Sequence, residues 1–153
     1  MAHNRNNDLI RSDEHYTPAW LFEALKLEFD IDVCAPEGGV TWIPAARYFT
    51  ESINCLTQEW QGRVWMNPPF SKPAPFVEKF IEHGNGIALM VVSKSKWFQA
   101  IWNAADAITP TARNMKFERP DGSNKTISFQ SFLFAMGKDN AEALHRLGDY
   151  KIR

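Results

Sequence analysis

Residues 86–92 are apolar without interruption and read Gly-Ile-Ala-Leu-Met-Val-Val. A strand with one face in water alternates apolar and polar residues, whereas an unbroken apolar run of this length is typical of a strand that is buried on both faces. Strands of that kind occur in parallel sheets that carry helices on either side. This segment therefore predicts a layered α/β fold.

Strand and helix signals alternate along the rest of the chain. Thr17 is expected to cap a first helix that begins at Pro18, and Asp139 with Glu142 forms a capping-box pattern at the start of the last helix. Apolar spacing predicts helices over 75–83 and 97–102 and strands over 29–35, 48–49, 63–66, 107–108, 115–117 and 128–136, with a turn at 120–122 between the last two. This order predicts a mostly parallel sheet flanked by helices, in one domain over 13–153 that follows a flexible arm over 1–12.

The tetrapeptide Asn67-Pro68-Pro69-Phe70 directly follows the predicted strand over 63–66. Two consecutive prolines cannot continue a central strand, so the chain must leave the sheet at this point. Residues 32–36 stand at the end of another predicted strand. Because ligands of α/β sheets bind in the crevice beyond the carboxyl ends of the strands, we expect both segments to face one site.

The tetrapeptide has the groups needed to activate an exocyclic base amine, whose lone pair is delocalised into the ring. The side-chain oxygen of Asn67 and the carbonyl oxygen of Pro68 can accept hydrogen bonds from the two N–H groups of this amine. The nitrogen then pyramidalises and directs its lone pair at a methyl donor. The fixed φ angles of Pro68 and Pro69 hold these acceptors in place. Phe70 offers an apolar face on which a base flipped out of the duplex can stack. Positioning and oriented hydrogen bonds supply this chemistry, which requires no metal.

Further short segments accompany the tetrapeptide in a specific order between about residues 13 and 136; they are 16–22, 29–35, 48–50, Trp60, 62–71 and 97–98. Together they resemble the phage-type DNA N6-adenine methyltransferases of the Dam group. The resemblance implies a Rossmann-like methyltransferase fold with a C-terminal antiparallel strand, S-adenosylmethionine as cofactor and DNA as substrate. The implied reaction is methylation of N6 of adenine at Asn67, Pro68, Pro69 and Phe70.

The resemblance also implies where the methionine end of the cofactor binds. Tyr16, Thr17 and Pro18 resemble the family segment near that end, where the exposed N–H groups of a helix start attract a carboxylate. Asp32, Ala35 and Pro36 resemble the cofactor-binding strand end. The glycine-rich form that is usual in methyltransferases is absent there, and residues 35–39 read Ala-Pro-Glu-Gly-Gly in its place.

Two residues compete for the ribose hydroxyls of the cofactor. An acid about 20 residues beyond the first strand end binds these hydroxyls in dinucleotide folds, and Glu51 stands at about that distance from Asp32. Asn54 is the other candidate, because the family places a polar residue just before the stretch that here runs from Leu56 to Trp60.

The distribution of charge indicates where DNA would bind. Acidic residues exceed basic ones over 1–62, whereas Lys and Arg are in excess over 63–153. Because contacts to phosphates need Lys and Arg, we expect the DNA-binding face on the second part of the chain. The candidates are Lys94, Lys96, Arg113, Lys116 and Lys125.

Three other functions remain open at this point. N4 of cytosine could be held by the same two acceptors, and protein glutamine methyltransferases use the same tetrapeptide pattern on a side-chain amide. An inactive cofactor fold that serves as a DNA-binding or interaction module is the third alternative.

Composition argues against a disulfide-rich, metal-binding, secreted or membrane protein. Two cysteines and four scattered histidines give neither a disulfide framework nor metal-ligand spacing. No apolar run approaches the roughly 20 residues that span a bilayer, and the polar N-terminus does not resemble a signal peptide. A metal-free cytoplasmic protein is therefore expected, in the host cytoplasm if a phage encodes it, and the sequence leaves its oligomeric state open.

Overall fold

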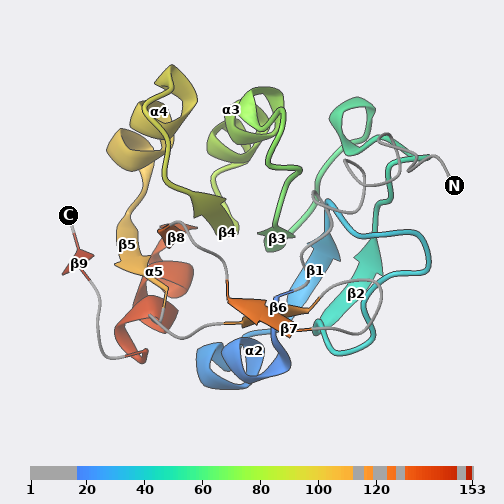
Figure 1. Ribbon diagram of the computed structural model, residues 1–153, viewed down its shortest axis with the longest axis horizontal. Coiled ribbons are helices and arrows are strands. Elements are labelled where there is room, and N and C mark those ends of the chain that lie inside the picture. Colours follow the sequence, from blue (N-terminus) through green and yellow to red (C-terminus); the bar gives the residue numbers. More distant parts are fainter. Residues whose placement is uncertain (1–16, 112–115, 119–123, 127–129, 148–150, 153) are drawn as a thin grey trace, which may run out of the picture.

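The computed structural model describes residues 17–111, 116–118, 124–126, 130–147 and 151–152. Seven strands in these residues form one sheet in the order β2-β1-β3-β4-β8-β5-β9 (Figure 1). These strands are β1 (Phe29–Asp32), β2 (Ala45–Tyr48), β3 (Val64–Met66), β4 (Gly86–Val91), β5 (Ala107–Pro110), β8 (Ser131–Met136) and β9 (Lys151–Ile152). Neighbours from β2 to β4 are parallel, β5 runs in the same direction, and β8 lies antiparallel between β4 and β5. The expected mostly parallel sheet with a C-terminal antiparallel strand is confirmed.

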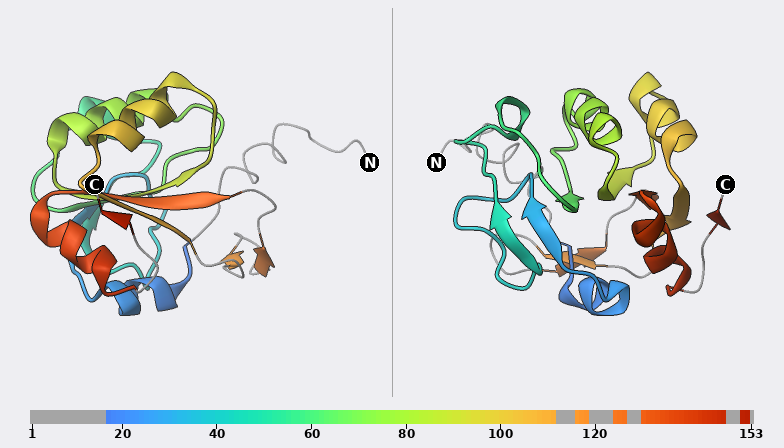
Figure 2. Two further views of the ribbon diagram at one scale, coloured as in Figure 1. Left: turned by 90° about the vertical axis from the view of Figure 1, so that its left-hand side faces the viewer. Right: turned by 180° about the vertical axis from the view of Figure 1, so that it is seen from behind.

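Helices cover both faces of this sheet (Figure 2). α2 (Ala19–Leu25) and α5 (Lys138–His145) lie on one face, and α3 (Ala74–His83) and α4 (Lys96–Ala104) lie on the other. Successive strand side chains point to opposite faces, so each strand contributes to two cores. Trp65 packs with residues of α2 and α5, whereas Val64 and Met66 pack with residues of α3 and α4. The same alternation along β4 explains why residues 86–92 are apolar throughout.

The position of β1 within the sheet creates the crevice in which a ligand can bind. β1 lies between β2 and β3, so the chain leaves it toward one edge of the sheet and later returns on its other side. In an open α/β sheet this reversal opens a crevice beyond the carboxyl ends of the strands. The loops that follow β1, β2 and β3 begin at these ends and surround the crevice.

Two predicted helix caps are wrong. The N-cap of α2 is Pro18, whose backbone is extended, and the buried Thr17 lies one residue outside the helix. α5 begins at Lys138 after Gly137, whose φ of 97° favours glycine, and no side chain caps it. Its first turn is instead held by Asn140, which donates to the carbonyl oxygen of Met136 across 2.7 Å, so Asp139 already lies inside the helix.

The C-terminal strands also differ from the expectation. β6 (Lys116–Glu118) does not pair with the strand that was expected over 128–136; it pairs with β7 (Asn124–Thr126) in a separate two-stranded sheet. β8 begins only at Ser131 and is a central strand, because its apolar side chains are buried against both helix layers. β2 begins at Ala45, directly after Pro44, rather than at Tyr48. In the part of the chain that the structure describes, no helix is long and apolar enough to cross a membrane.

Candidate active site

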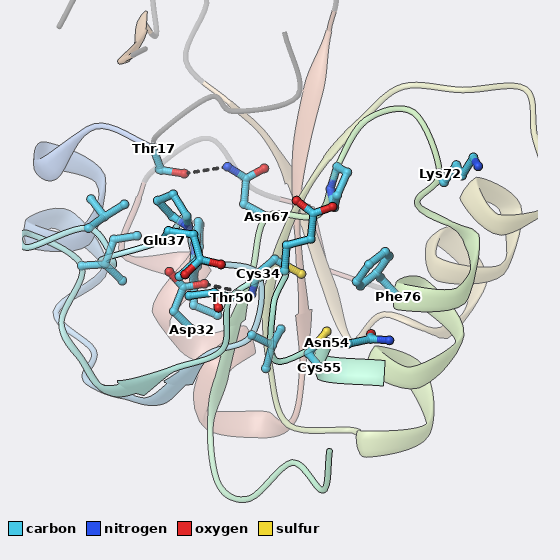
Figure 3. Close-up of a pocket in the computed structure, with 18 of the residues that line it drawn as sticks. Thr17, Asp32, Cys34, Glu37, Thr50, Asn54, Cys55, Asn67, Lys72 and Phe76 are labelled. Atoms are coloured by element: carbon cyan, nitrogen blue, oxygen red, sulfur yellow. Dashed lines mark hydrogen bonds between the residues drawn. The ribbon is translucent and has the colours of Figure 1, made fainter. Parts of the chain in front are cut away.

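A cavity of about 570 Å³ opens beyond the carboxyl ends of β1, β2 and β3 (Figure 3). Residues from all three strand-end loops line it, together with the segment before α2 and the first turn of α3. The predicted site residues among them are Thr17, Asp32, Ala35, Pro36, Glu51, Asn54, Asn67 and Pro69. The cavity therefore joins the candidate cofactor residues to the tetrapeptide.

Other predicted site residues do not line this cavity. Pro18, Pro68 and Phe70 adjoin lining residues in sequence without belonging to the lining themselves. The candidate Tyr16 lies outside the described residues, as does the predicted arm over 1–12.

Several lining residues were missed by sequence reasoning. Some adjoin predicted positions and could have been found by extending each strand-end segment; they are Val33, Cys34, Glu37, Thr50, Cys55, Ser71 and Lys72. Phe76 lies farther along the chain, in the first turn of α3. Trp65, which is buried in the core, also lines the cavity. Val40 and Ile43 have no local signal, because they reach the cavity only through the path of the loop between β1 and β2.

Asp32 ends β1 and shapes the loop that follows. Its Oδ1 atom accepts the backbone N–H of Cys34 across 3.2 Å, which turns the chain out of the sheet earlier than the predicted strand end at residue 35. The side chain is 4% exposed. Burial raises the pKa of Asp32 to about 7, and the hydrogen bond from Cys34 opposes the rise. A cation that binds beside Asp32 in the cavity would therefore favour the ionised form of this carboxyl group near neutral pH.

Thr17 and Asn67 meet at one end of the cavity. The Nδ2 atom of Asn67 donates to Oγ1 of Thr17 across 3.5 Å. Thr17 is itself held, since Trp42 donates from Nε1 to its carbonyl oxygen across 2.7 Å. With Nδ2 turned toward Thr17, the amide oxygen of Asn67 faces the opposite way (Figure 3). This orientation suits an acceptor for an incoming amine.

The loops after β1 and β2 are joined at the rim of the cavity. Glu37 accepts hydrogen bonds from the backbone N–H of Ser52, across 3.3 Å, and from the Ser52 hydroxyl. These bonds hold the pKa of Glu37 below its usual value, so its carboxylate is ionised at neutral pH. Glu51, the residue before Ser52, is exposed at the same rim.

Asn54 is used by the backbone of its own loop. Its φ is 59°, and its Oδ1 atom accepts the N–H of Leu56 across 3.2 Å to cap the short 3-10 helix η1 (Cys55–Thr57). Both Cys34 and Cys55, whose thiols are free, line the cavity close to this cap. A hydrogen bond with Cys55 and burial raise the pKa of the Cys34 thiol, so it stays protonated.

The lysine candidates for DNA binding have different positions. Lys94, in the segment between β4 and α4, and Lys96, the first residue of α4, are exposed at the sheet edge that carries the cavity but do not line it. Ser95 donates from its backbone N–H to the Ser93 hydroxyl across 3.1 Å and holds this turn. Arg113 lies outside the described residues, and of Lys116 and Lys125 only the backbone is described, in β6 and β7. Within the described residues, no group of three or more His, Cys, Asp or Glu side chains could hold a metal ion.

Comparison with known proteins gives consistent matches. The family model described as DNA N-6-adenine-methyltransferase (Dam) matches residues 6–131. A DNA N-6-adenine-methyltransferase of Haemophilus phage HP1 (strain HP1c1) is 33% identical over 143 residues and covers 82% of this chain and 81% of its own length. A DNA N-6-adenine-methyltransferase of Escherichia phage T1 is 34% identical over 89 residues, which are 53% of this chain and 36% of that protein. The region matched by the family contains every residue that lines the cavity.

Proposed function

The chain belongs to the DNA N-6-adenine-methyltransferase (Dam) family, and on this premise we propose that it transfers a methyl group from S-adenosylmethionine to N6 of adenine in DNA. S-adenosylmethionine supplies a methyl group on a positively charged sulfur, which makes that group electrophilic. The observation that carries the proposal is the single cavity, because Asp32, Glu51 and Asn67 from three different strand ends line it together. A donor and an acceptor of a methyl group need such a shared space to meet at bonding distance.

The lining of the cavity fits this cofactor. Asp32, Glu37 and Glu51 are acidic, whereas Lys72 is basic, and the cavity has the volume of a typical small-molecule site. A negative lining suits a molecule that carries an ammonium group, a cationic sulfur and two ribose hydroxyls. We assign the ammonium group to Asp32, whose buried carboxyl gains a partner for its charged form.

The other cofactor contacts follow from the neighbours of Asp32. Thr17 would lie near the methionine carboxylate, with Tyr16 and Pro18 beside it in sequence, while Ala35 and Pro36 would border the chain of the cofactor. Of the two candidates for the ribose hydroxyls, Glu51 is favoured, because the side-chain oxygen of Asn54 already caps η1.

The target base would enter from the side of the tetrapeptide. The amide oxygen of Asn67 and the carbonyl oxygen of Pro68 accept hydrogen bonds from the two N–H groups of the adenine amine. The amine then directs its lone pair at the methyl group. The hydrogen bond from Asn67 to Thr17 supports this role, because it orients the amide so that its oxygen faces away from Thr17. Pro69 keeps the turn rigid, and Phe70 stacks on the flipped base.

DNA phosphates would be held by lysines at the same sheet edge. Lys94 and Lys96 support this because both are exposed, Lys94 in the turn after β4 and Lys96 at the start of α4. Arg113, Lys116 and Lys125 stay as candidates by their charge and their place in the second part of the chain.

The test is to incubate the purified protein with unmethylated DNA and S-adenosylmethionine and to analyse the nucleosides by mass spectrometry. We expect N6-methyladenine. N4-methylcytosine would move the reaction to cytosine, and the absence of any methylated nucleoside despite cofactor binding would contradict the proposal. Methylation of glutamine in proteins would then be tested next. If the protein does not bind the cofactor, the remaining interpretation is an inactive cofactor fold that serves as an interaction module.

A further inference from the structure

Lys79 on α3 reaches across to the loop that forms one wall of the cavity. Its ammonium group donates hydrogen bonds to three backbone carbonyl oxygens, those of Cys55 at 3.1 Å, Leu56 at 3.2 Å and Gln58. The same ammonium lies 5.3 Å from the centre of the Trp60 ring. Hydrogen bonds from a charged donor are stronger than those between neutral groups, so this one side chain adds three strong hydrogen bonds between α3 and the loop.

Other contacts also anchor the loop that Lys79 holds, among them the hydrogen bonds from Ser52 to Glu37. Residues 51–54 are exposed, including Ile53 at 45%, and Cys55 is the first buried residue after them. Trp60 adds one hydrogen bond, from Nε1 to the carbonyl oxygen of Cys55 across 3.0 Å. Because little apolar surface is buried between Glu51 and Asn54, the position of the loop depends on hydrogen bonds, of which Lys79 donates three.

The same loop supplies lining residues to the cavity. Glu51, Asn54 and Cys55 line it directly, and Asn54 caps the η1 turn whose carbonyl groups Lys79 binds. Phe76 of α3 also lines the cavity, one helical turn before Lys79. The helix that follows the Asn67–Phe70 turn is thereby tied to the loop that carries the candidate ribose-binding residue.

We propose that Lys79 is a positioning residue for the cofactor: it fixes the 51–58 wall of the cavity in the arrangement that binds S-adenosylmethionine, without touching the cofactor itself. This inference rests on the proposed function for its ligand. Loss of the three carbonyl contacts lets the wall open, so only a fraction of the molecules is competent to bind. The apparent dissociation constant rises by the inverse of that fraction, and a competent fraction of about one tenth weakens binding roughly tenfold. The Asn67–Phe70 turn is untouched, so kcat at saturating cofactor stays the same.

The experiment compares Lys79→Met with Lys79→Arg and with the control Lys138→Met. Methionine keeps an unbranched apolar stem without the charge, arginine restores a charged donor, and Lys138 is an exposed lysine on α5, which packs on the other face of the sheet. Calorimetry with S-adenosylhomocysteine and steady-state methylation of DNA would give the dissociation constant, the KM for S-adenosylmethionine and kcat. We expect Lys79→Met to raise the dissociation constant and KM about tenfold at constant kcat. Lys79→Arg should recover most of the affinity, and Lys138→Met should match wild type.

Hydrogen exchange provides a readout that needs no cofactor. In Lys79→Met the amides of Leu56, Thr57 and Gln58, which are hydrogen-bonded within η1, should exchange faster, while those of α5 keep their rates. If Lys79→Met does not fold, Lys79→Gln replaces it, since glutamine keeps one N–H donor group. Wild-type affinity together with unchanged exchange in a folded variant overturns the positioning role. A wild-type protein that binds no cofactor would instead overturn the proposed function, and faster exchange would still report the contact made by Lys79.

Discussion

The side-chain amide of Asn67 donates to the hydroxyl of Thr17 across 3.5 Å, although 50 positions separate the two residues in the sequence. Thr17 precedes α2, and Asn67 follows β3, so the contact exists only once the sheet and its first helix have packed together. The contact places Nδ2 of Asn67 toward Thr17, with the amide oxygen on the other side.

Replacing Thr17 with Val removes the hydroxyl but keeps the shape of the buried side chain. A net hydrogen bond is worth about 0.5–1.5 kcal/mol, so we expect kcat to fall roughly two- to tenfold as the amide of Asn67 loses its fixed orientation. Thr17→Ser keeps the hydroxyl and should retain most of the rate. Steady-state methylation at saturating cofactor and DNA measures both variants, and equal kcat values for Thr17→Val and wild type would contradict the orienting role.

The buried carboxyl of Asp32 should make cofactor binding depend on pH. Its pKa is about 7 in the absence of ligand, and a cation beside it favours the ionised form. The affinity for S-adenosylmethionine should therefore increase as pH rises through about 6 to 8, with release of a proton on binding. The asparagine of Asp32→Asn cannot ionise, so calorimetry should find weaker cofactor binding with an affinity that does not change with pH. A pH dependence like that of wild type would show that Asp32 does not bind the cofactor.

The same raised pKa predicts how the stability of the ligand-free protein changes with pH. The folded state keeps the proton of Asp32 at pH values where the unfolded chain has lost it, so between about pH 4 and 7 the folded state binds more protons. The contribution of Asp32 to the free energy of unfolding therefore decreases as pH rises through this range. Urea unfolding at several pH values should give a smaller decrease for Asp32→Asn than for wild type.

Phe70→Ala separates capture of the base from its activation. The variant keeps both acceptors of the amine, at Asn67 and Pro68, but removes an aromatic platform that is worth about 1–3 kcal/mol for a stacked base. Its KM for DNA should rise, while the affinity for the cofactor stays the same because Phe70 does not line the cavity. Phe70→Tyr keeps the ring and serves as the control. An unchanged KM for DNA in the alanine variant would exclude the stacking role.

The double variant Lys94→Gln/Lys96→Gln tests the proposed DNA contacts. Each lost phosphate contact reduces the slope of log K against log salt by about one unit, so we expect weaker DNA binding with a flatter salt dependence. The matched control is Lys26→Gln/Lys138→Gln, which removes the same charge from two exposed lysines, one at the C-cap of α2 and one at the start of α5, away from the turn after β4. Fluorescence anisotropy over a salt series measures both, and equal slopes for the two double variants would place the DNA elsewhere.

The sheet and the tetrapeptide could be predicted because their signals are local. The unbroken apolar run of β4 requires two covered faces, and Pro68 with Pro69 requires an exit from the sheet. The pairing of β6 with β7 could not be predicted, since short strands do not specify their partner. Burial on both faces, which makes β8 a central strand, becomes visible only in the packed structure.

Contacts between distant segments limit what the sequence reveals about the site. Glu37 adjoins the predicted Pro36, but its hydrogen bond with Ser52, 15 positions away, has no local pattern that could predict it. Lys79 likewise binds carbonyl groups 21 to 24 positions before it, so its sequence context is that of an ordinary helix residue. The family resemblance predicts that Thr17 lies near the cofactor, but its hydrogen bond with Asn67 depends on how α2 packs on β3.

The rate of DNA methylation by Asn67→Ala tests the central claim most directly. The variant should fold and bind S-adenosylmethionine like wild type, because the change leaves the carboxylates of the cavity in place. Loss of an oriented hydrogen-bond partner in a closed site costs about 2.7–4 kcal/mol, so we predict that single-turnover formation of N6-methyladenine slows by roughly 10²–10³. A folded, cofactor-bound Asn67→Ala protein that methylates adenine at a rate close to wild type would contradict the account.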